Sequence, residues 1–179
     1  ELITARLPVT LMICLLASII SIVLGLSAGV VSAVRRNTVT DHVVRVVSLV
    51  GLSMPDFWLG LLLILTFSIT WQVFPLTGFV PLGTDFFGGM RFLVLPSLAL
   101  GLTLAGFLTR LTRGSLLEVL SADYVRTAKS KGLSANRVVL RHALGTALLP
   151  LVTIVGLNFG RLLGGAVVIE SVFSLPGIG

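Results

Sequence analysis

The sequence contains few charged residues: only 11% of its 179 residues are Asp, Glu, Lys or Arg, with 7 acidic residues against 13 basic ones. Soluble domains carry about 25% charged residues. The low charge, the 55% hydrophobic residues and a mean hydropathy of +1.09 exclude an ordinary cytosolic enzyme, a small secreted scaffold and a disordered tail. The composition instead predicts an all-α polytopic membrane protein.

Residue types that carry chemistry are also scarce. The single cysteine, Cys14, lies in an apolar run without a second thiol or a neighbouring group of histidines, which excludes an internal disulfide and a zinc site. No GxxxxGK[ST] nucleotide loop, nucleophile elbow or metal motif occurs. We therefore expect no catalytic residue, no bound cofactor or metal, and no ATP hydrolysis by this chain itself.

Long apolar stretches dominate what is present. A transmembrane helix needs about 20 apolar residues. Four stretches are long enough or nearly so, and they cover residues 8–34, 46–71, 92–109 and 143–168. Pro55 and Pro150 lie within two of them and are expected to bend their helices.

The basic residues are concentrated in two of the connecting segments. Ten of the 13 lie between the first and second spans or between the third and fourth: Arg35, Arg36, Arg45, Arg110, Arg113, Arg126, Lys129, Lys131, Arg137 and Arg141. The positive-inside rule makes these segments cytoplasmic, so both chain ends and the loop at 73–91 face outward. The basic excess thus reflects membrane topology, and no nucleic-acid partner is expected.

The cytoplasmic segment at about residues 113–142 has its own pattern. Ser121 is expected to cap a helix over residues 123–131, Gly132 to end it in a left-handed conformation, and Ser134 to cap a second helix. A basic loop lying on anionic lipid is the alternative. That alternative explains the charges, but it does not explain why Ser121, Gly132 and Ser134 are spaced as a helix cap, a helix end and a second helix cap.

Several runs of this sequence resemble those of ATP-binding cassette (ABC) importer permeases, most of all the dipeptide and oligopeptide branch. The cytoplasmic runs resemble the EAA loop of that family: 123–134 (DYVRTAKSKGLS), 141–144 (RHAL) and 148–150 (LLP). Others lie along the rest of the chain: 6–11 (RLPVTL), 53–55 (SMP), 95–98 (LPSL), 109–113 (TRLTR) and 170–179 (ESVFSLPGIG).

This resemblance implies one type I ABC importer permease domain over residues 1–179, with four transmembrane helices here and a further helix expected before residue 1 and after residue 179. It implies a multi-pass protein of a bacterial or archaeal plasma (inner) membrane that forms half of a translocation pathway. The implied partners are a second homologous permease, two ATPase subunits that bind ATP and Mg²⁺, an extracytoplasmic substrate-binding protein, and the lipid bilayer. Di- or oligopeptides are the implied substrate, with nickel or glutathione as the alternatives.

The resemblance also implies that the cytoplasmic helix docks on an ATPase subunit. The residues expected to make this contact are Tyr124, Val125, Arg126, Thr127, Ala128, Lys129, Gly132 and Leu133. Residues 126–128 read RTA where the family has EAA, so no carboxylate contact is expected at Arg126. An ion-coupled secondary transporter is the less favoured class, because it needs an acidic group near the bilayer midplane and the acids here lie near the span edges, with Asp56 as the one ambiguous case.

Two further patterns lie within the spans. Asn158 and Arg161 are three residues apart and share a helix face, which we expect to line the outer part of the pathway. Arg161 lies about 27 Å along its helix from Ala143, so snorkelling to the outer headgroups is the alternative.

Small residues recur every fourth position and predict close helix packing. These are Gly25 and Gly29 in the first span and Gly156, Gly160 and Gly164 in the fourth.

The deduced topology can be tested by cysteine labelling. An impermeant thiol reagent applied to right-side-out cells is expected to modify Ser174→Cys, near the outward end, and to spare Ser130→Cys in the cytoplasmic segment. The physical reason is the asymmetry of the basic residues across the membrane. The reverse labelling pattern would overturn the assignment.

Overall fold

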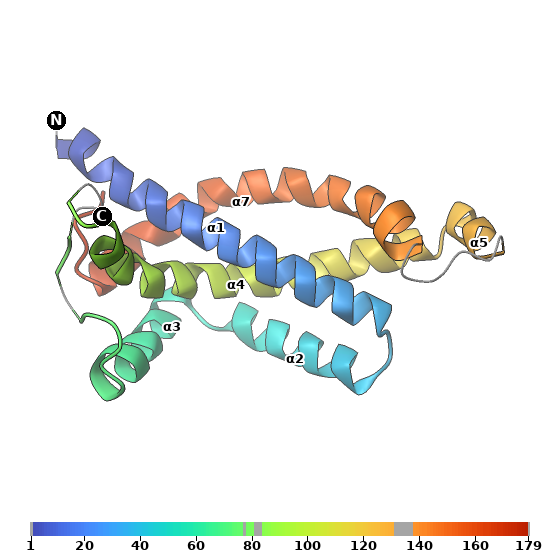
Figure 1. Ribbon diagram of the computed structural model, residues 1–179, viewed down its shortest axis with the longest axis horizontal. Helices are drawn as coiled ribbons and strands as arrows, with labels where there is room; N and C mark the ends of the chain where they lie inside the picture. Colours follow the sequence, from blue (N-terminus) through green and yellow to red (C-terminus); the bar gives the residue numbers. More distant parts are fainter. Residues whose placement is uncertain (1, 77, 81–83, 131–137, 179) are drawn as a thin grey trace.

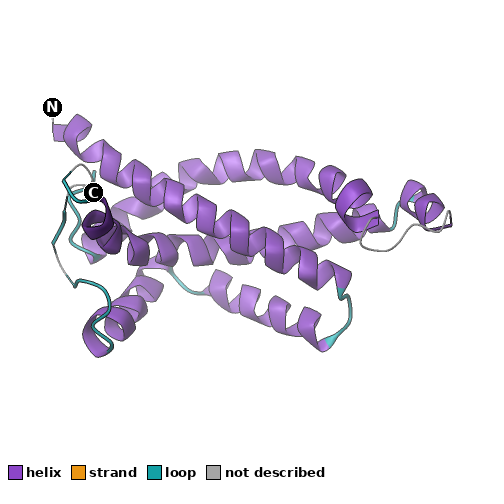
Figure 2. Ribbon diagram, in the orientation of Figure 1, coloured by secondary structure: helices purple, strands orange, loops and turns teal. Residues whose placement is uncertain are grey.

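The computed structural model describes residues 2–76, 78–80, 84–130 and 138–178, which form a helical bundle without a strand among them (Figures 1 and 2). This confirms the all-α prediction. Its elements are α1 (Leu2–Val34), α2 (Val39–Ser53), α3 (Asp56–Leu63), the π-helical η1 (Ile64–Thr70), α4 (Phe86–Leu120), α5 (Asp123–Ser130), the π-helical η2 (Val138–Ala143) and α7 (Leu144–Val172).

Three of these helices, α1, α4 and α7, are long and apolar enough to cross a membrane within the described residues. The expected second span is not one straight helix. Helix α2 meets the segment formed by α3 and η1 at an angle of 102°, and the two pieces make a fourth span only if they are counted together. The bend follows from Pro55, which disfavours helical backbone at the preceding residue. Met54 accordingly has an extended backbone, with ψ of 128°.

The third span is longer than expected. Helix α4 begins at Phe86, where the carboxylate of the N-cap residue Asp85 accepts a hydrogen bond of 3.0 Å from the backbone N–H of Gly88. It continues past the predicted end at 109 to Leu120. Thr112 and Leu116 in this extension are fully buried. The helix therefore persists beyond its most apolar part because tertiary contacts cover one of its faces.

Helix α4 is the centre of the bundle, and α1 packs along much of its length (Figure 1). The two backbones approach closely at Gly25 and Gly29 of α1. A Cβ atom at Gly25 would lie 2.6 Å from the Cβ of Leu108, and one at Gly29 would lie 2.8 Å from the carbonyl oxygen of Thr109. Glycine is required here because any side chain would force the helices apart.

The two ends of the bundle differ in what they carry. Both chain ends and the segment before α4 lie at one end in Figure 1, whereas α5 and the turn between α1 and α2 lie at the other. This arrangement agrees with the topology deduced from the basic residues.

At the outward end, the buried carboxylate of Glu170 accepts a hydrogen bond from the hydroxyl of Thr10, which in turn accepts one of 3.2 Å from the N–H of Ile178. These bonds hold the C-terminal segment against α1.

The close contact between α1 and α4 predicts opposite effects at two glycines. Gly29→Ala should lower the stability of the protein by about 1–3 kcal/mol through overpacking. Gly114→Ala in α4 should leave stability unchanged or raise it by up to about 1 kcal/mol, because nothing lies within 4 Å of its Cβ position and Ala favours the helix. Thermal unfolding in detergent measures both. Equal effects of the two substitutions would contradict the packing argument.

Candidate functional site

Helix α5 is attached to the cytoplasmic end of the bundle through one apolar face. Val125 and Ala128 are three residues apart and therefore share a face, and both are buried. They form a small core with Val138 of η2, against which Val119 and Leu120 at the end of α4 also pack. Since they face the body of the bundle, Val125 and Ala128 anchor α5. The expectation that they enter an ATPase cleft is corrected accordingly.

The opposite face of α5 is open. The side chain of Tyr124 is 47% exposed, and Thr127 is exposed with its hydroxyl donating to the carbonyl oxygen of Asp123 at 3.0 Å. These two residues remain available to a partner protein. Gly132, Leu133 and Ser134, and the side chains of Arg126 and Lys129, lie outside the described residues.

The bounds of α5 agree closely with the expected helix at 123–131. Ser121, however, does not have the expected role as the N-cap of this helix. Ser121 occupies the C-cap position of α4, and its hydroxyl donates to the carbonyl oxygen of Glu118 at 2.7 Å. Its N–H also bonds back to α4. Ser121 therefore closes α4, and only Ala122 separates it from the start of α5. The two helices are joined by a short connection.

A buried carboxylate lies next to this end of the bundle. Asp41 in the first turn of α2 has a fully buried side chain and accepts two hydrogen bonds from Arg113 of α4, at 2.8 Å to Nε and 2.9 Å to Nη2. It also accepts bonds from the hydroxyl of Ser32 in α1, at 2.6 Å, and from the N–H of Asn37, at 2.9 Å. One side chain thus joins α1, α2 and α4.

The geometry of the Asp41–Arg113 pair makes it a stiff connection. The two parallel N–H···O bonds fix the planes of both groups, whereas a lysine would contribute only a point charge. Arg45 approaches the same carboxylate at 3.6 Å, but its side chain is 42% exposed, against 20% for Arg113. Arg113 is therefore the principal partner. It lies ten residues before Asp123, the first residue of α5.

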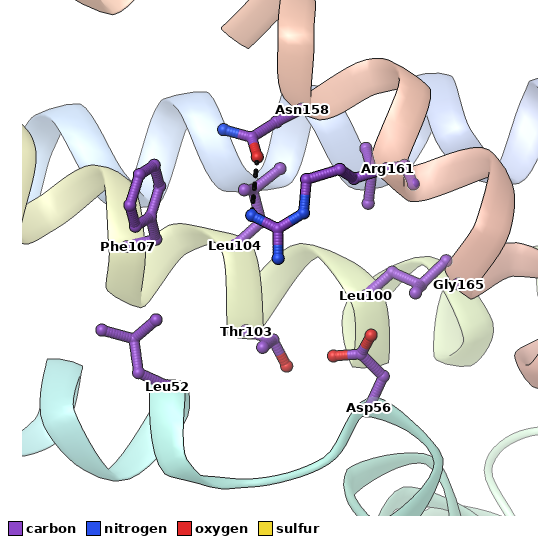
Figure 3. A pocket seen from close by; sticks show the side chains of 10 residues that line it. Leu52, Asp56, Leu100, Thr103, Leu104, Phe107, Asn158, Arg161 and Gly165 are labelled. Carbon is purple, nitrogen blue, oxygen red and sulfur yellow. Dashed lines mark hydrogen bonds between the residues drawn. The ribbon is translucent and has the colours of Figure 1, made fainter. Parts of the chain in front are cut away.

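A second polar site lies at the bend between α2 and α3. A cavity of about 230 Å³ opens there among α3, α4 and α7. Asp56 of α3, Thr103 of α4, and Asn158 and Arg161 of α7 face it (Figure 3). Its remaining lining residues are Leu52, Leu100, Leu104, Phe107, Leu162 and Gly165. The cavity combines a mainly apolar wall with a few convergent polar groups, as ligand sites do.

Asn158 and Arg161 share a face, as the spacing predicts, and Arg161 Nη1 donates to Asn158 Oδ1 at 3.4 Å (Figure 3). Arg161 lies near the middle of its helix. Helix α7 ends at Val172, eleven residues beyond Arg161, or about 16 Å. The cavity also borders the middle of α4, at Thr103 and Leu104. Arg161, which is exposed, therefore faces this cavity from near the middle of α7.

The two sets of glycines have different surroundings. Gly25 and Gly29 lie against α4, as described above. By contrast, no described atom lies within 4 Å of a Cβ built at Gly156, Gly160 or Gly164, outside the α7 backbone itself. The close packing expected at these three residues is not made within the described part of the chain. Helical spacing shows that they share a face but does not show what covers it.

Sequence reasoning missed Asp41 and the importance of Asp56. Asp41 carried a visible signal, because it follows the helix-capping residue Thr38 by three positions and precedes Arg45 by four, which predicts a local i,i+4 pair. Its main partner, Arg113, is 72 residues away and carries no such signal. The sequence leaves the depth of Asp56 within its span ambiguous. The bend at Pro55 directs it into the bundle.

Comparison with known proteins agrees with this architecture. Residues 21–179 match the family described as binding-protein-dependent transport system inner membrane component. The chain is 45% identical to a putative peptide transport system permease protein of Brucella abortus, over 99% of this chain and 56% of the relative. It is 42% identical to the oligopeptide transport system permease protein AppB of Bacillus subtilis, over 100% of this chain and 57% of the relative.

The dipeptide transport system permease protein DppB of Escherichia coli K12 is 38% identical, over 97% of this chain and 58% of the relative. In fold, the chain is similar to a crystal structure of an amino acid ABC transporter with histidines, with a TM-score of 0.73 at 15% identity, over 99% of this chain and 74% of the other. The chain spans a little over half the length of these curated relatives.

The fold and the family match define a multi-pass membrane protein of the ABC permease class. The chain belongs to the family of binding-protein-dependent transport system inner membrane components.

The two arginines near Asp41 give a matched pair of substitutions. Arg113→Leu should lower stability by about 3–5 kcal/mol, because it leaves a buried carboxylate without its bidentate partner. Arg45→Gln should cost about 1 kcal/mol or less, since this arginine is partly exposed and more distant. Thermal unfolding in detergent distinguishes them. A double variant, Asp41→Asn with Arg113→Leu, should recover part of the loss; equal losses for the two single variants would contradict the argument.

Proposed function

We propose that this chain is a permease subunit of an ATP-driven, binding-protein-dependent importer of di- or oligopeptides and forms half of the translocation pathway. The family membership supports the transport role, and the relatives named above as peptide, oligopeptide and dipeptide permeases support the substrate. ATP hydrolysis is assigned to two separate ATPase subunits, and delivery of the peptide to an extracytoplasmic binding protein.

One structural observation carries the proposal. Helix α5 packs on the end of α4 through Val119 and Leu120 and on η2 through Val138. The π-helical η2 runs directly into α7. The same two long helices, α4 and α7, line the cavity at mid-length. A displacement of α5 therefore acts at the ends of both helices that enclose the polar site.

Coupling follows from this arrangement. When two ATPase subunits close on ATP, a docked α5 moves with them, and α4 and α7 shift as packed elements that exchange inward for outward access. The Asp41–Arg113 pair extends the movement to α1 and α2, because Asp41 is hydrogen-bonded to both Ser32 and Arg113. Tyr124 is the exposed aromatic of α5 and is assigned as the anchor on the ATPase, since aromatic residues are enriched at interface cores.

A second permease subunit is assigned to the open glycine face of α7. Gly156, Gly160 and Gly164 lie on this face, where their backbone permits a close helix approach. Helices pair in a bilayer chiefly through such close contacts. The face is adjacent in the helix to Arg161, so a partner seated there would border the cavity and complete its wall.

Nickel and glutathione remain the alternative substrates, and an ion-coupled transporter the alternative class. The position of Asp56 in the cavity is the one observation that favours ion coupling, because such transporters use intramembrane carboxylates. The two classes of transporter differ in what drives uptake. In vesicles holding the complete complex, uptake should require ATP; uptake driven by a proton gradient without ATP would identify the ion-coupled class.

The docking role of α5 is tested by Tyr124→Ala. Truncating an aromatic interface anchor weakens an interface by about 2 kcal/mol or more, so ATPase co-purification and ATP-driven peptide uptake should fall at least about tenfold. Tyr124→Phe should retain most of both activities. The matched control is Phe87→Ala. Phe87 is 83% exposed in the first turn of α4, at the opposite end of that helix from α5, and should be dispensable for ATPase binding. Normal co-purification and uptake with Tyr124→Ala would refute docking through this residue.

A further inference from the structure

The cavity between α3, α4 and α7 contains two opposite charges that do not neutralise each other. Asp56 and Arg161 both line it (Figure 3), yet their charged atoms lie more than 4.0 Å apart and no ion pair joins them. Within the described residues, the polar contact of Arg161 is the long hydrogen bond to Asn158. The carboxylate of Asp56 has no hydrogen-bond or ion-pair partner in the same part of the chain.

Such a pair of charges is costly within a membrane-spanning bundle. Ionisable groups at membrane depth pair with one another, with backbone carbonyls or with a ligand, and they mark substrate pathways. Here the space between the groups is occupied by the cavity. A molecule that fills it and satisfies both groups carries a positive group toward Asp56 and a negative group toward Arg161.

We propose that this cavity binds both charged termini of a short free peptide, the α-ammonium at Asp56 and the α-carboxylate at Arg161. The inference rests on the proposed function and names the part of the pathway that recognises the substrate. Both termini of a free peptide are ionised at neutral pH. The guanidinium fork of arginine matches a carboxylate, and an ammonium group has three N–H donors, of which a carboxylate can accept at least one. Asn158 supplies a side-chain amide for the peptide bond between the two termini.

The local structure makes both charges accessible. Asp56 lies in the first turn of α3, where the backbone N–H groups of the helix end point toward its side of the cavity mouth. Opposite it is Gly165 of α7, at which even a Cβ would lie 3.4 Å from Asp56 Oδ2. A larger residue at 165 would cover the carboxylate. Gly165 lies one helical turn beyond Arg161, so the two charged sites are adjacent along the same helix.

Size and charge restrict the ligand class. The volume of about 230 Å³ is below the roughly 300–1,000 Å³ of sites for drug-sized ligands, so a dipeptide fits better than a long chain. A metal cargo is disfavoured by the donors, because the cavity offers a single carboxylate and no group of three His, Cys, Asp or Glu side chains occurs among the described residues. Glutathione carries a second carboxylate, for which the lining has no second cation.

A cysteine reporter in the cavity tests this directly. Thr103→Cys in the complete purified complex is alkylated with a small maleimide; the native Cys14 is fully buried and serves as an unreactive background. Alanyl-alanine should slow the alkylation. N-acetyl-alanyl-alanine amide, which lacks both charges, should not. Adding Asp56→Asn or Arg161→Gln should raise the dipeptide concentration needed for half-protection about tenfold or more.

Matched neutralisations outside the cavity serve as controls. Arg110→Gln removes an exposed arginine of α4, and Asp85→Asn removes an outer carboxylate while keeping an N-cap residue of equal quality. Neither should alter protection. Each terminus is also tested separately: Asp56→Asn should abolish the preference for a free over an acetylated amine, and Arg161→Gln the preference for a free carboxylate over an amide.

Three results would overturn the proposal. Equal protection by glycerophosphoethanolamine, a soluble lipid headgroup with the same two charges, would show a general zwitterion site without peptide recognition. ATP-driven uptake of alanyl-alanine without protection at residue 103 would refute the site and leave the proposed function intact. Absence of uptake of any peptide by the unmodified complex would refute both.

Discussion

The close contact between α1 and α4 is the constraint on which the other elements depend. Gly25 and Gly29 bring the two backbones together, and at the cytoplasmic end Asp41 joins them through Ser32 and Arg113. A buried carboxylate with bidentate and backbone partners has few alternative positions, because every displacement removes charge-assisted hydrogen bonds in a poorly hydrated environment. The remaining helices therefore pack against a fixed pair, and motion is expected at their ends and at the bend.

The bend between α2 and α3 turns a potential simple span into a site. A straight second helix would leave Asp56 on a helix face with no cavity to enter. The 102° break instead separates α2 from α3 and directs the first turn of α3 toward α7. Pro55 is sufficient to explain the break, and the break determines that Asp56 lines the same cavity as Arg161. Helix α5, attached to α4 and η2, lies at one end of the same two helices, which line the cavity at mid-length. The polar site and α5 are thus joined by the same two packed helices, α4 and α7.

Much of this architecture could be predicted from the sequence, with clear limits. The expected helix at 123–131 matches α5, and the spacing of Asn158 and Arg161 places them on one face, because both depend on local periodicity. The burial of Val125 and Ala128 against α4 and η2 was missed, since their i,i+3 spacing indicates a common face but not its partner. The extension of α4 to Leu120 was missed as well. Hydropathy indicates which segments can enter the membrane, but it does not show that the less apolar end of α4 is buried against neighbouring helices.

The sequence by itself determined the class of protein and the location of α5, and it predicts the inward and outward sides, because apolar length, arginine placement and helix signals act over short stretches of chain. Only the tertiary structure decided which charges meet. Asp41 and Arg113 are 72 residues apart, and Asp56 and Arg161 approach one cavity from different helices. Such pairings depend on helix rotation and on a single bend, and a change of a few tens of degrees in either would turn the same side chains toward lipid.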